Sequence, residues 1–216
     1  MRADGSDSNS GDSWGQAFQT IRKAIQSAAS WTDEIWVKQG TYQPSSYILV
    51  DGVLGIYGGF DGSETERGQR DWRKNVTTID GRGIIYHCFY IDSAMDVVVI
   101  DGFTITGGNT NGPDESNPYR VHGSGGGIFN HQAASTIANC TFVNNKAIQY
   151  TGGGGAIYVH SVNAPTITNC AFYNNEAMGS GGTHGGAIHS NSSNPCLSIL
   201  EEDRASQKPW IWEPTN

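Results

Sequence analysis

The sequence is poor in charged residues, and those it has are mostly negative. Its 216 residues include 13 Lys and Arg against 21 Asp and Glu, which gives a formal net charge of −8. Proteins that hold nucleic acid by its phosphates present a basic face. This sequence contains no basic cluster, so we expect no nucleic-acid partner.

Long apolar stretches are also missing. A membrane-spanning helix needs about 18 or more consecutive apolar residues, and the chain contains no such run. Residues 1–12 lack the apolar core of a signal peptide. We therefore expect no transmembrane span, and we expect any export signal to lie outside this sequence.

Only four cysteines are present, and no two of them form a Cys-x-x-Cys pair. The lack of that pair argues against a zinc ribbon or a thioredoxin-like redox motif. Cys140 and Cys170 occupy equivalent positions of the repeat described below. We interpret them as small buried side chains on adjacent coils and expect free thiols, although a disulfide could form if the two side chains turned toward each other.

Glycine, in contrast, is abundant, with 29 residues. This abundance disfavours a helical bundle, because each interior Gly costs about 1 kcal/mol relative to Ala. Short β-branched runs alternate with Gly, Asn, Ser and Thr, which is typical of many strands joined by tight turns. The predicted strands are Glu34–Lys38, Ser46–Val50, Val53–Tyr57, Val76–Asp80, His87–Ile91 and Val97–Thr106.

One amphipathic helix is predicted over residues 13–30, ahead of all the strands. Ser13 is a suitable N-cap, and apolar residues recur at three- and four-residue steps from Trp14 to Ala28. The first coil of a solenoid exposes its core and unpaired strand edges unless another segment covers it. We therefore interpret this helix as an N-terminal cap.

Internal repeats determine the expected fold. Gly126–Phe129 matches Gly155–Tyr158 at a spacing of 29 residues, and Gly186–His189 follows after another 31. Asn139–Phe142 matches Asn169–Phe172 at a spacing of 30. No helix-length amphipathic segment separates these units, so successive strands can stack in parallel only by winding as a β-helix. We predict an all-β, right-handed parallel β-helix in which the repeated Ile, Cys and Phe form interior stacks.

These patterns divide the chain into a capping segment over residues 1–32, β-helix coils over 33–195 and an atypical tail over 196–216. The repeat loses its phase in the tail, which has no glycine and contains Trp210 and Trp212. The tail is either a short cap or the point where a longer array was cut. An open end would favour self-association, because it exposes unpaired strand edges.

The repeats also resemble those of a known family. Gly154–Ile157 and Gly185–Ile188 are Gly-Gly-Ala-Ile motifs, and Phe142–Asn145 and Phe172–Asn175 are Phe-x-x-Asn motifs. Together they resemble the repeats of bacterial polymorphic outer-membrane proteins. The N-terminal part, including residues 33–37, is similar to the pectate-lyase-like β-helix superfamily. That superfamily includes polysaccharide lyases, pectin-type hydrolases, adhesins and non-catalytic surface proteins, so the resemblance implies a fold and leaves the function open.

Two functional classes are compatible with this fold. The first is a secreted or cell-surface segment that binds carbohydrate or a partner surface through a regular face rich in Tyr, Asn and Thr. The second is a polysaccharide-degrading enzyme, either a lyase or a glycoside hydrolase, with a groove along the coils. The first is favoured, because every candidate group of catalytic or metal-binding residues also has an ordinary structural explanation.

Asp80 and Asp101 are the first catalytic candidates. Ile79–Gly81 matches Ile100–Gly102 at a spacing of 21 residues, which predicts that the two acids share one face. A separation of one strand spacing would lie near the lower end of the roughly 5–9.5 Å that glycosidases use. The alternative is structural, because Asp before Gly at the end of a strand is a common turn.

Residues 107–124 are predicted to form a long surface loop, a common place for a ligand site on a regular scaffold. A basic residue beside acidic residues would resemble the arrangement in calcium-dependent β-helix lyases, which makes calcium a candidate cofactor. The alternative is a solvated insertion. The catalytic candidates in this loop are Asp114, Glu115, Arg120 and His122.

Two further groups are candidate metal ligands. Asp4, Asp7 and Asp12 suggest calcium, but their spacing does not fit an EF-hand loop, and a set of turns is the alternative. His131 and His160 should stack on neighbouring coils and could hold a transition metal. The sequence fixes no third ligand for them, so a structural or surface role is the alternative.

Overall fold

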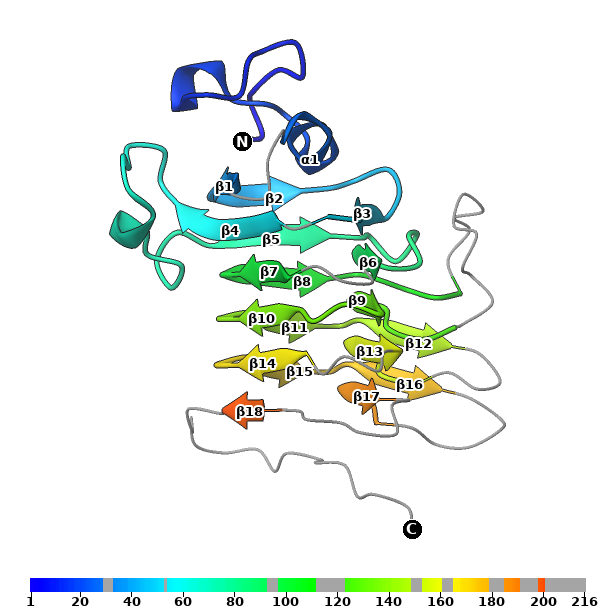
Figure 1. The fold of residues 1–216 in the computed structure, drawn as a ribbon. Coiled ribbons are helices and arrows are strands. Elements are labelled where there is room, and N and C mark those ends of the chain that lie inside the picture. The colour runs from blue at the N-terminus through cyan, green and yellow to red at the C-terminus, as the bar shows by residue number, and fades with distance from the viewer. Residues whose placement is uncertain are drawn as a thin grey trace.

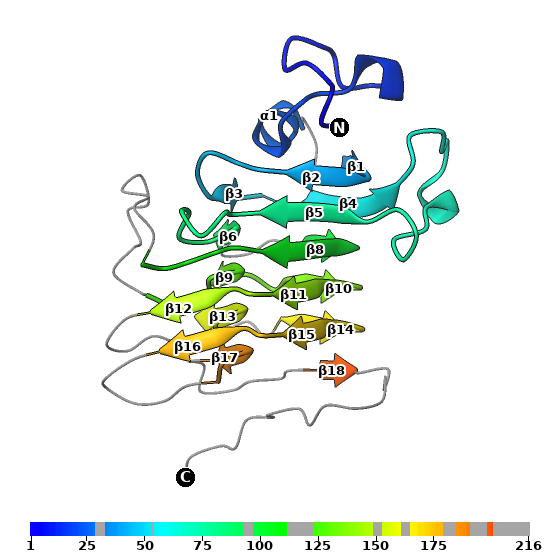
Figure 2. The same cartoon turned by 180° about the vertical axis from the view of Figure 1, so that it is seen from behind.

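A computed structural model shows a parallel β-helix with one α-helix at its N-terminal end (Figure 1). Successive coils stack along one axis, and Figure 2 shows the same stack from behind. The predicted all-β parallel architecture is confirmed. The structure describes residues 1–28, 33–52, 54–92, 97–111, 123–148, 153–160, 165–178, 185–190 and 198–200.

Three sheets form the sides of the coil, and all their strand pairs are parallel. Sheet A contains β1 (Glu34–Lys38), β4 (Leu54–Phe60), β7 (Val98–Asp101), β10 (Thr136–Ala138), β14 (Thr166–Thr168) and β18 (Ser198–Leu200). Sheet B contains β2 (Gly40–Tyr42), β5 (Thr77–Asp80), β8 (Phe103–Thr106), β11 (Thr141–Val143) and β15 (Ala171–Tyr173). Sheet C contains β3 (Ile48–Val50), β6 (Phe89–Asp92), β9 (Ile128–His131), β13 (Ile157–His160) and β17 (Ile188–Ser190). A two-stranded sheet pairs β12 (Lys146–Ile148) with β16 (Glu176–Met178).

Columns of identical or similar side chains fill the interior. One isoleucine from each strand of sheet A pairs in register with the next, and the burial of each of the first five contributes about 2 kcal/mol. These residues are Ile35, Ile56, Ile100, Ile137, Ile167 and Ile199. On sheet B, the rings of Phe142 and Phe172 stack with centroids 5.2 Å apart. The core is therefore a set of ladders that run along the axis of the coil.

The predicted repeat of about 30 residues is confirmed. Ile128, Ile157 and Ile188 pair in register on three consecutive strands of sheet C. Cys140 and Cys170 precede the paired strands β11 and β15, and the backbone N–H of Ala171 donates to the carbonyl of Cys140 at 2.9 Å. Both thiols are free and buried, as expected.

The earlier 21-residue match is wrong. Ile79 pairs with Ile105 in sheet B, whereas Ile100 pairs with Ile56 and Ile137 in sheet A. Asp80 and Asp101 therefore lie on different sides of the coil. The two motifs resemble each other because each is a strand end followed by a glycine. In addition, the single strand predicted over residues 97–106 is two strands, which turn at Gly102 with a φ of 83°.

The N-terminal helix is shorter than predicted. The α-helix α1 spans Ile21–Ser27, and its N-cap is Thr20, whose hydroxyl accepts from the backbone N–H of Lys23. Ser13 instead precedes the 3₁₀ turn η1 (Trp14–Gln16) and makes no side-chain capping bond. The Asp7 carboxylate accepts from the backbone N–H groups of Gln19 and Thr20 at 2.9 and 2.8 Å. These bonds hold that stretch in a non-helical path, because side-chain acceptors compete with the helical pattern.

The helix nevertheless lies at the N-terminal end of the stack, as a cap would (Figure 1). Phe18, Ile21 and Ala24 are buried in the same core cluster as the first strands. Within the described ranges, we find no helix with the length and apolar character needed to cross a membrane.

We expect Cys88 and Cys140 to resist alkylation in the folded protein. Burial raises the pKa of Cys88 to about 12 and also raises the pKa of Cys140. The thiolate is the reactive form, and at pH 8 a pKa near 12 leaves about 10⁻⁴ of Cys88 ionised. Iodoacetamide treatment at pH 8 followed by mass spectrometry should find both residues unmodified until guanidinium is added. Rapid labelling of either residue in the folded protein would contradict the buried placement.

Candidate ligand-binding faces

A column of threonines crosses the outer face of sheet B. Thr41, Thr78, Thr104 and Thr141 pair in register on four consecutive strands, β2, β5, β8 and β11. Tyr42, Ile79, Ile105 and Phe142, which follow them along the strands, are buried, whereas these four threonine side chains are exposed or half-buried. Parallel strands lie about 4.8 Å apart, so the face presents hydroxyl groups at a regular interval. Each hydroxyl can both donate and accept a hydrogen bond.

A second column runs beside the threonines on the same face. It contains Asp80, Thr106, Val143 and Tyr173, which pair in register from β5 to β15. The side chain of Tyr173 is 55% exposed. The face therefore combines a line of hydroxyl groups with an exposed aromatic ring on its last strand.

The two predicted catalytic acids both make structural hydrogen bonds. Asp80 accepts from the side-chain amide of Gln43 at 3.0 Å and from the backbone N–H of Arg82 at 2.8 Å. Asp101 forms a 2.8 Å ion pair with Arg70 and accepts from the Asn139 amide at 2.8 Å. The side chains of Arg70 and Asp101 are only 11% and 14% exposed. The described residues thus bring neither acid near the other, and each stabilises its own part of the coil.

Asp101 also begins a ladder of amides. The Asn139 side chain donates to Asp101, and the Asn169 side chain donates to Asn139 Oδ1 at 2.6 Å. Both asparagines have positive φ angles, 54° and 50°, at the turns between sheets A and B. Asparagine tolerates this left-handed conformation better than most residues. The repeated Asn of the sequence motif is therefore a corner residue.

The three acids predicted as calcium ligands, Asp4, Asp7 and Asp12, do not share a contact. Burial raises the pKa of Asp7, but hydrogen bonds from Thr20 and Gln19 outweigh this effect, and the net pKa is lowered. Asp4 pairs with Arg2 at 3.4 Å, and Asp12 is exposed. Across the part of the chain that the structure describes, no group of three His, Cys, Asp or Glu residues could hold a metal ion.

The four charged candidates of the predicted loop lie outside the described residues: Asp114, Glu115, Arg120 and His122. The ends of this segment are described. The buried hydroxyl of Thr110 donates to the carbonyl of Gly123 at 3.1 Å and accepts from the backbone N–H of Ile148 at 2.7 Å. The segment therefore leaves and rejoins the coil at one place, beside β12.

The outer face of sheet C carries a column of rings that the sequence analysis did not identify. Tyr90, Phe129, Tyr158 and His189 pair in register, and successive ring centroids lie 5.3, 5.2 and 5.4 Å apart. Tyr90 and Phe129 are fully buried. The aromatic residue after each repeated Ile was a signal for this column, but the repeat does not reach Tyr90.

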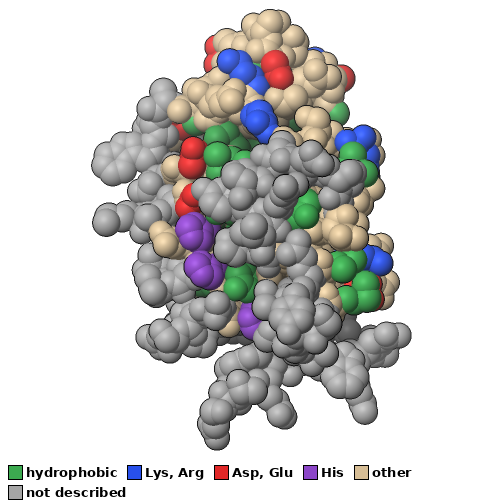
Figure 3. Space-filling view, turned by 90° about the vertical axis from the view of Figure 1, so that its right-hand side faces the viewer, with side chains coloured by type: hydrophobic (Ala, Val, Ile, Leu, Met, Phe, Trp, Pro, Cys, Tyr) green, Lys and Arg blue, Asp and Glu red, His purple; other side chains and the backbone are tan. Residues whose placement is uncertain are grey.

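The next column on sheet C contains Asp92, His131 and His160, in register on β6, β9 and β13. The predicted histidine stack is confirmed, with ring centroids 5.3 Å apart and an interplanar angle of 13°. His131 Nδ1 lies 2.9 Å from the Asp92 carboxylate. Figure 3 shows histidine side chains gathered on this side of the molecule, below acidic ones.

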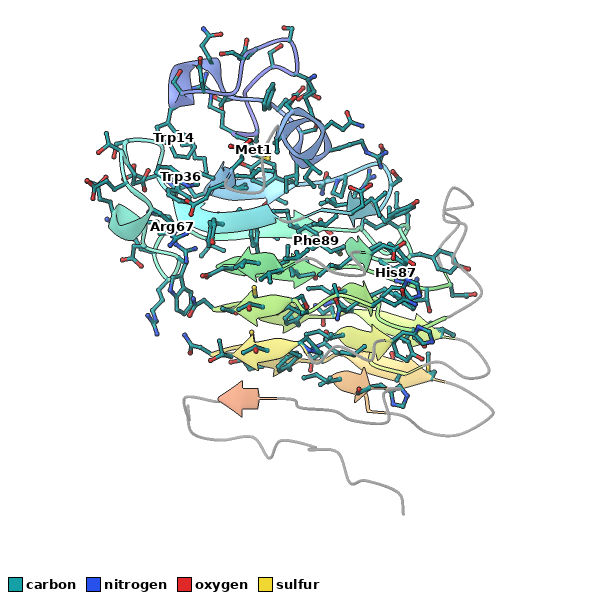
Figure 4. All side chains as sticks on the ribbon, viewed as in Figure 1. Met1, Trp14, Trp36, Arg67, His87 and Phe89 are labelled. Carbon is teal, nitrogen blue, oxygen red and sulfur yellow. The ribbon has the colours of Figure 1, made fainter. Side chains whose placement is uncertain are left out.

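A further aromatic cluster lies near the N-terminal end and was also missed. Trp36 stacks on Phe60 with centroids 4.8 Å apart, and Trp14 lies 5.6 Å from Phe60 (Figure 4). Arg67, in the 3₁₀ turn η2 (Arg67–Gln69), pairs with Glu34 and lies over the ring of Tyr57 at 4.6 Å. These contacts attach the N-terminal segment and the loop after β4 to the outer face of sheet A, which indicates a structural role.

The geometry defines a parallel β-helix repeat protein. A comparison with known families identifies a similar repeat for part of the chain. Residues 139–160 match the model of the Chlamydia polymorphic membrane protein repeat. The matched stretch includes all of β11, β12 and β13, together with one Phe-x-x-Asn and one Gly-Gly-Ala-Ile motif. No curated protein and no solved structure matches the chain significantly. Residues 139–160 are therefore similar to a polymorphic membrane protein repeat.

Proposed function

We propose that this chain is a cell-surface β-helix segment that binds a polysaccharide along the outer face of sheet B. The observation that carries this proposal is the in-register column of Thr41, Thr78, Thr104 and Thr141. Sugar hydroxyls can exchange hydrogen bonds with such a column, and the apolar face of a sugar ring can pack on the exposed ring of Tyr173. An extended polymer would meet the same contact on successive strands.

The repeat match supports the placement at a surface. Polymorphic membrane protein repeats are named for proteins of the membrane, and the sequence resemblance likewise points to bacterial outer-membrane proteins. A regular solenoid side suits binding to a repeating partner, because each coil repeats the geometry of the previous one. The similarity to the pectate-lyase-like superfamily stays a prediction.

Binding is favoured over polysaccharide cleavage. Glycoside hydrolysis needs two carboxylates on either side of the scissile bond, and Asp80 and Asp101 lie in different sheets with separate hydrogen-bond partners. Of the predicted catalytic candidates, this leaves only the charged residues of the segment 112–122, which lie outside the described residues.

Removing two hydroxyls from the threonine column should weaken polysaccharide binding. Valine keeps the shape of threonine and replaces the hydroxyl with a methyl group, so T104V/T141V tests the hydrogen bonds alone. Each hydrogen bond contributes about 1 kcal/mol, so we expect a roughly 30-fold loss of affinity. Affinity electrophoresis against a panel of neutral and acidic polysaccharides, with and without calcium, would measure it.

The matched control is T136V/T166V. Thr136 and Thr166 also pair in register and lie at the surface, but they belong to sheet A. We expect this variant to bind like the wild type. Equal losses in the two double variants, or a wild type that no polysaccharide retards, would contradict the proposal.

A further inference from the structure

The two stacked cysteines place a pair of thiols inside the coil, whereas the proposed polysaccharide face lies outside it. Cys140 and Cys170 each stand directly before an in-register strand, since Thr141 of β11 pairs with Ala171 of β15 (Figure 1). The backbone N–H of Ala171 donates to the carbonyl of Cys140 at 2.9 Å. Neighbouring positions on parallel strands lie about 4.8 Å apart. This separation is within the range of roughly 4.4–6.8 Å between the Cα atoms of a disulfide.

The side chain of Cys170 already leans toward the coil of Cys140. Its thiol lies 3.6 Å from the carbonyl oxygen of Ile137, which belongs to that coil. The thiol of Cys140 lies 3.1 Å from the carbonyl oxygen of Ala138 and 3.7 Å from that of Ile100, one coil nearer the N-terminus. A disulfide therefore requires Cys140 to rotate about its Cα–Cβ bond. A thiol is a weak donor, so its hydrogen bonds oppose this rotation little.

The two thiols differ in how readily they react. Cys170 is 8% exposed and Cys140 is 1% exposed, because β15 is the edge strand of sheet B in the described part of the chain. A hydrogen bond from the Cys140 thiol lowers the pKa of Cys170 despite its burial, whereas burial and the neighbouring Cys170 thiol raise the pKa of Cys140. The thiolate is the form that oxidants attack. Cys170 is therefore the reactive member of the pair, and Cys140 is its neighbour in reserve.

We propose that Cys140 and Cys170 are a peroxide-sensitive pair, in which Cys170 is oxidised first and Cys140 then closes a disulfide between adjacent coils. The Cys170 thiolate attacks one oxygen of hydrogen peroxide, the O–O bond breaks, hydroxide leaves, and Cys170 becomes a sulfenic acid. The Cys140 sulfur then attacks the Cys170 sulfur. The S–O bond breaks, and the oxygen leaves as water with the proton of Cys140. The two cysteines lose two electrons, which the peroxide gains.

The product would be a covalent link between residues that are 30 positions apart in the sequence. Hydrogen peroxide is small, which suits a thiol that is only slightly exposed. Disulfides form and persist at cell surfaces, where the environment is oxidising. The pair would therefore join two coils where the chain meets oxidants and leave them separate under reducing conditions.

Peroxide treatment of the reduced, folded full chain at pH 8 tests the proposal. Free thiols are then alkylated in guanidinium, and the chain is digested without reduction for mass spectrometry. We expect a peptide pair that joins Cys140 to Cys170 and disappears with dithiothreitol. In C140S, where serine keeps a hydrogen-bond donor beside Cys170, dimedone should trap Cys170 as a sulfenic acid. In C170S, Cys140 should be oxidised at least about 100-fold more slowly than Cys170 in C140S, because far less of it is thiolate.

C88S is the matched control. Cys88 is also fully buried, and its thiol donates to a backbone carbonyl, that of Thr106, at 3.3 Å. Burial raises its pKa to about 12, and no neighbouring thiol lowers it. C88S should form the link between Cys140 and Cys170 like the wild type, and Cys88 should stay reduced in the wild type.

Two results would overturn the proposal. One is a wild type that forms no link between Cys140 and Cys170 under peroxide. The other is a set of links in which these two residues join Cys88 or Cys196 as often as each other, which would indicate oxidation of unfolded chains. Cys196 lies outside the described residues, so the linked peptides are identified individually. Circular dichroism shows whether each variant is folded, and the wild-type link is decisive without any variant.

Discussion

Replacing Asn145 with Ala should lower the melting temperature by about 6–12 °C, the shift expected for a loss of about 3 kcal/mol in a chain of this size. Asn145 is fully buried. Its Oδ1 accepts from the backbone N–H of Gly108 at 3.1 Å, and its amide donates to the Ile105 carbonyl at 2.9 Å and to Asn175 Oδ1 at 3.0 Å. Alanine would remove all three side-chain bonds, and a buried group that loses its partner, such as the N–H of Gly108, costs about 1–3 kcal/mol. A thermal melt followed by circular dichroism measures the change.

The adjacent residue provides the control. Asn144 is exposed and has a φ of 56°, a conformation that glycine adopts without strain. We therefore expect Asn144→Gly to change stability by less than about 1 kcal/mol. If Asn145→Ala melted within 2 °C of the wild type, or if the two variants were equally destabilised, the buried hydrogen bonds of Asn145 would not be the stabilising feature that the structure indicates.

Gly155→Ala should be at least as damaging, with a loss of about 3 kcal/mol or more. Gly155 is the second glycine of a Gly-Gly-Ala-Ile motif, and a Cβ there would lie 2.5 Å from the carbonyl oxygens of both Glu176 and Gly186. Both obstacles are backbone atoms of the following coil, so no side chain can rotate to make room. The two coils would have to separate, which breaks the ladders between them. Thermal melting and limited proteolysis of the variant would show the loss.

Gly68→Ala is the corresponding control, because a Cβ at Gly68 meets no atom within 4 Å. We expect it to change stability by less than about 0.5 kcal/mol. A Gly155→Ala variant as stable as Gly68→Ala would mean that the coils are packed less closely than the structure indicates.

The strands of the late coils were predictable from sequence because successive coils there have nearly the same number of residues. Ile128, Ile157 and Ile188 recur every 29–31 residues, and each carries the same glycines before it. The earlier coils vary in length, because the loop after β4 lengthens one of them. The sequence match of Ile79 with Ile100 therefore joined two different sides of the coil, while the true partner of Ile79 is Ile105.

The helix prediction failed at its start for a local reason. Periodicity alone extends the helix back to Ser13, but it cannot show that the Asp7 carboxylate binds the backbone of Gln19 and Thr20 from 12 and 13 residues away. That contact joins residues distant in sequence, so helix propensities, which depend on local sequence, cannot predict it. The apolar positions themselves were identified correctly, since Phe18, Ile21 and Ala24 are buried.

The candidate faces were predictable only in part. The stack of His131 on His160 followed from the repeat, but Asp92 lies in a coil of different sequence. The threonine column has no regular spacing in the sequence. Successive members, from Thr41 through Thr78 and Thr104 to Thr141, are 37, 26 and 37 residues apart. Such a column is visible only after the strand register is known.

Strands β10 and β14 pair in register, as do β11 and β15, so each of these coils places equivalent residues at equivalent positions. Ile137 and Ile167, like Phe142 and Phe172, fill the same place one coil apart. Loss of one whole coil would bring the flanking coils together with every column intact, whereas loss of a few residues would put each column out of phase. Deletion or duplication of one whole coil in the gene would therefore shorten or lengthen the β-helix by about 4.8 Å. The columns of side chains on each sheet would keep their residue types.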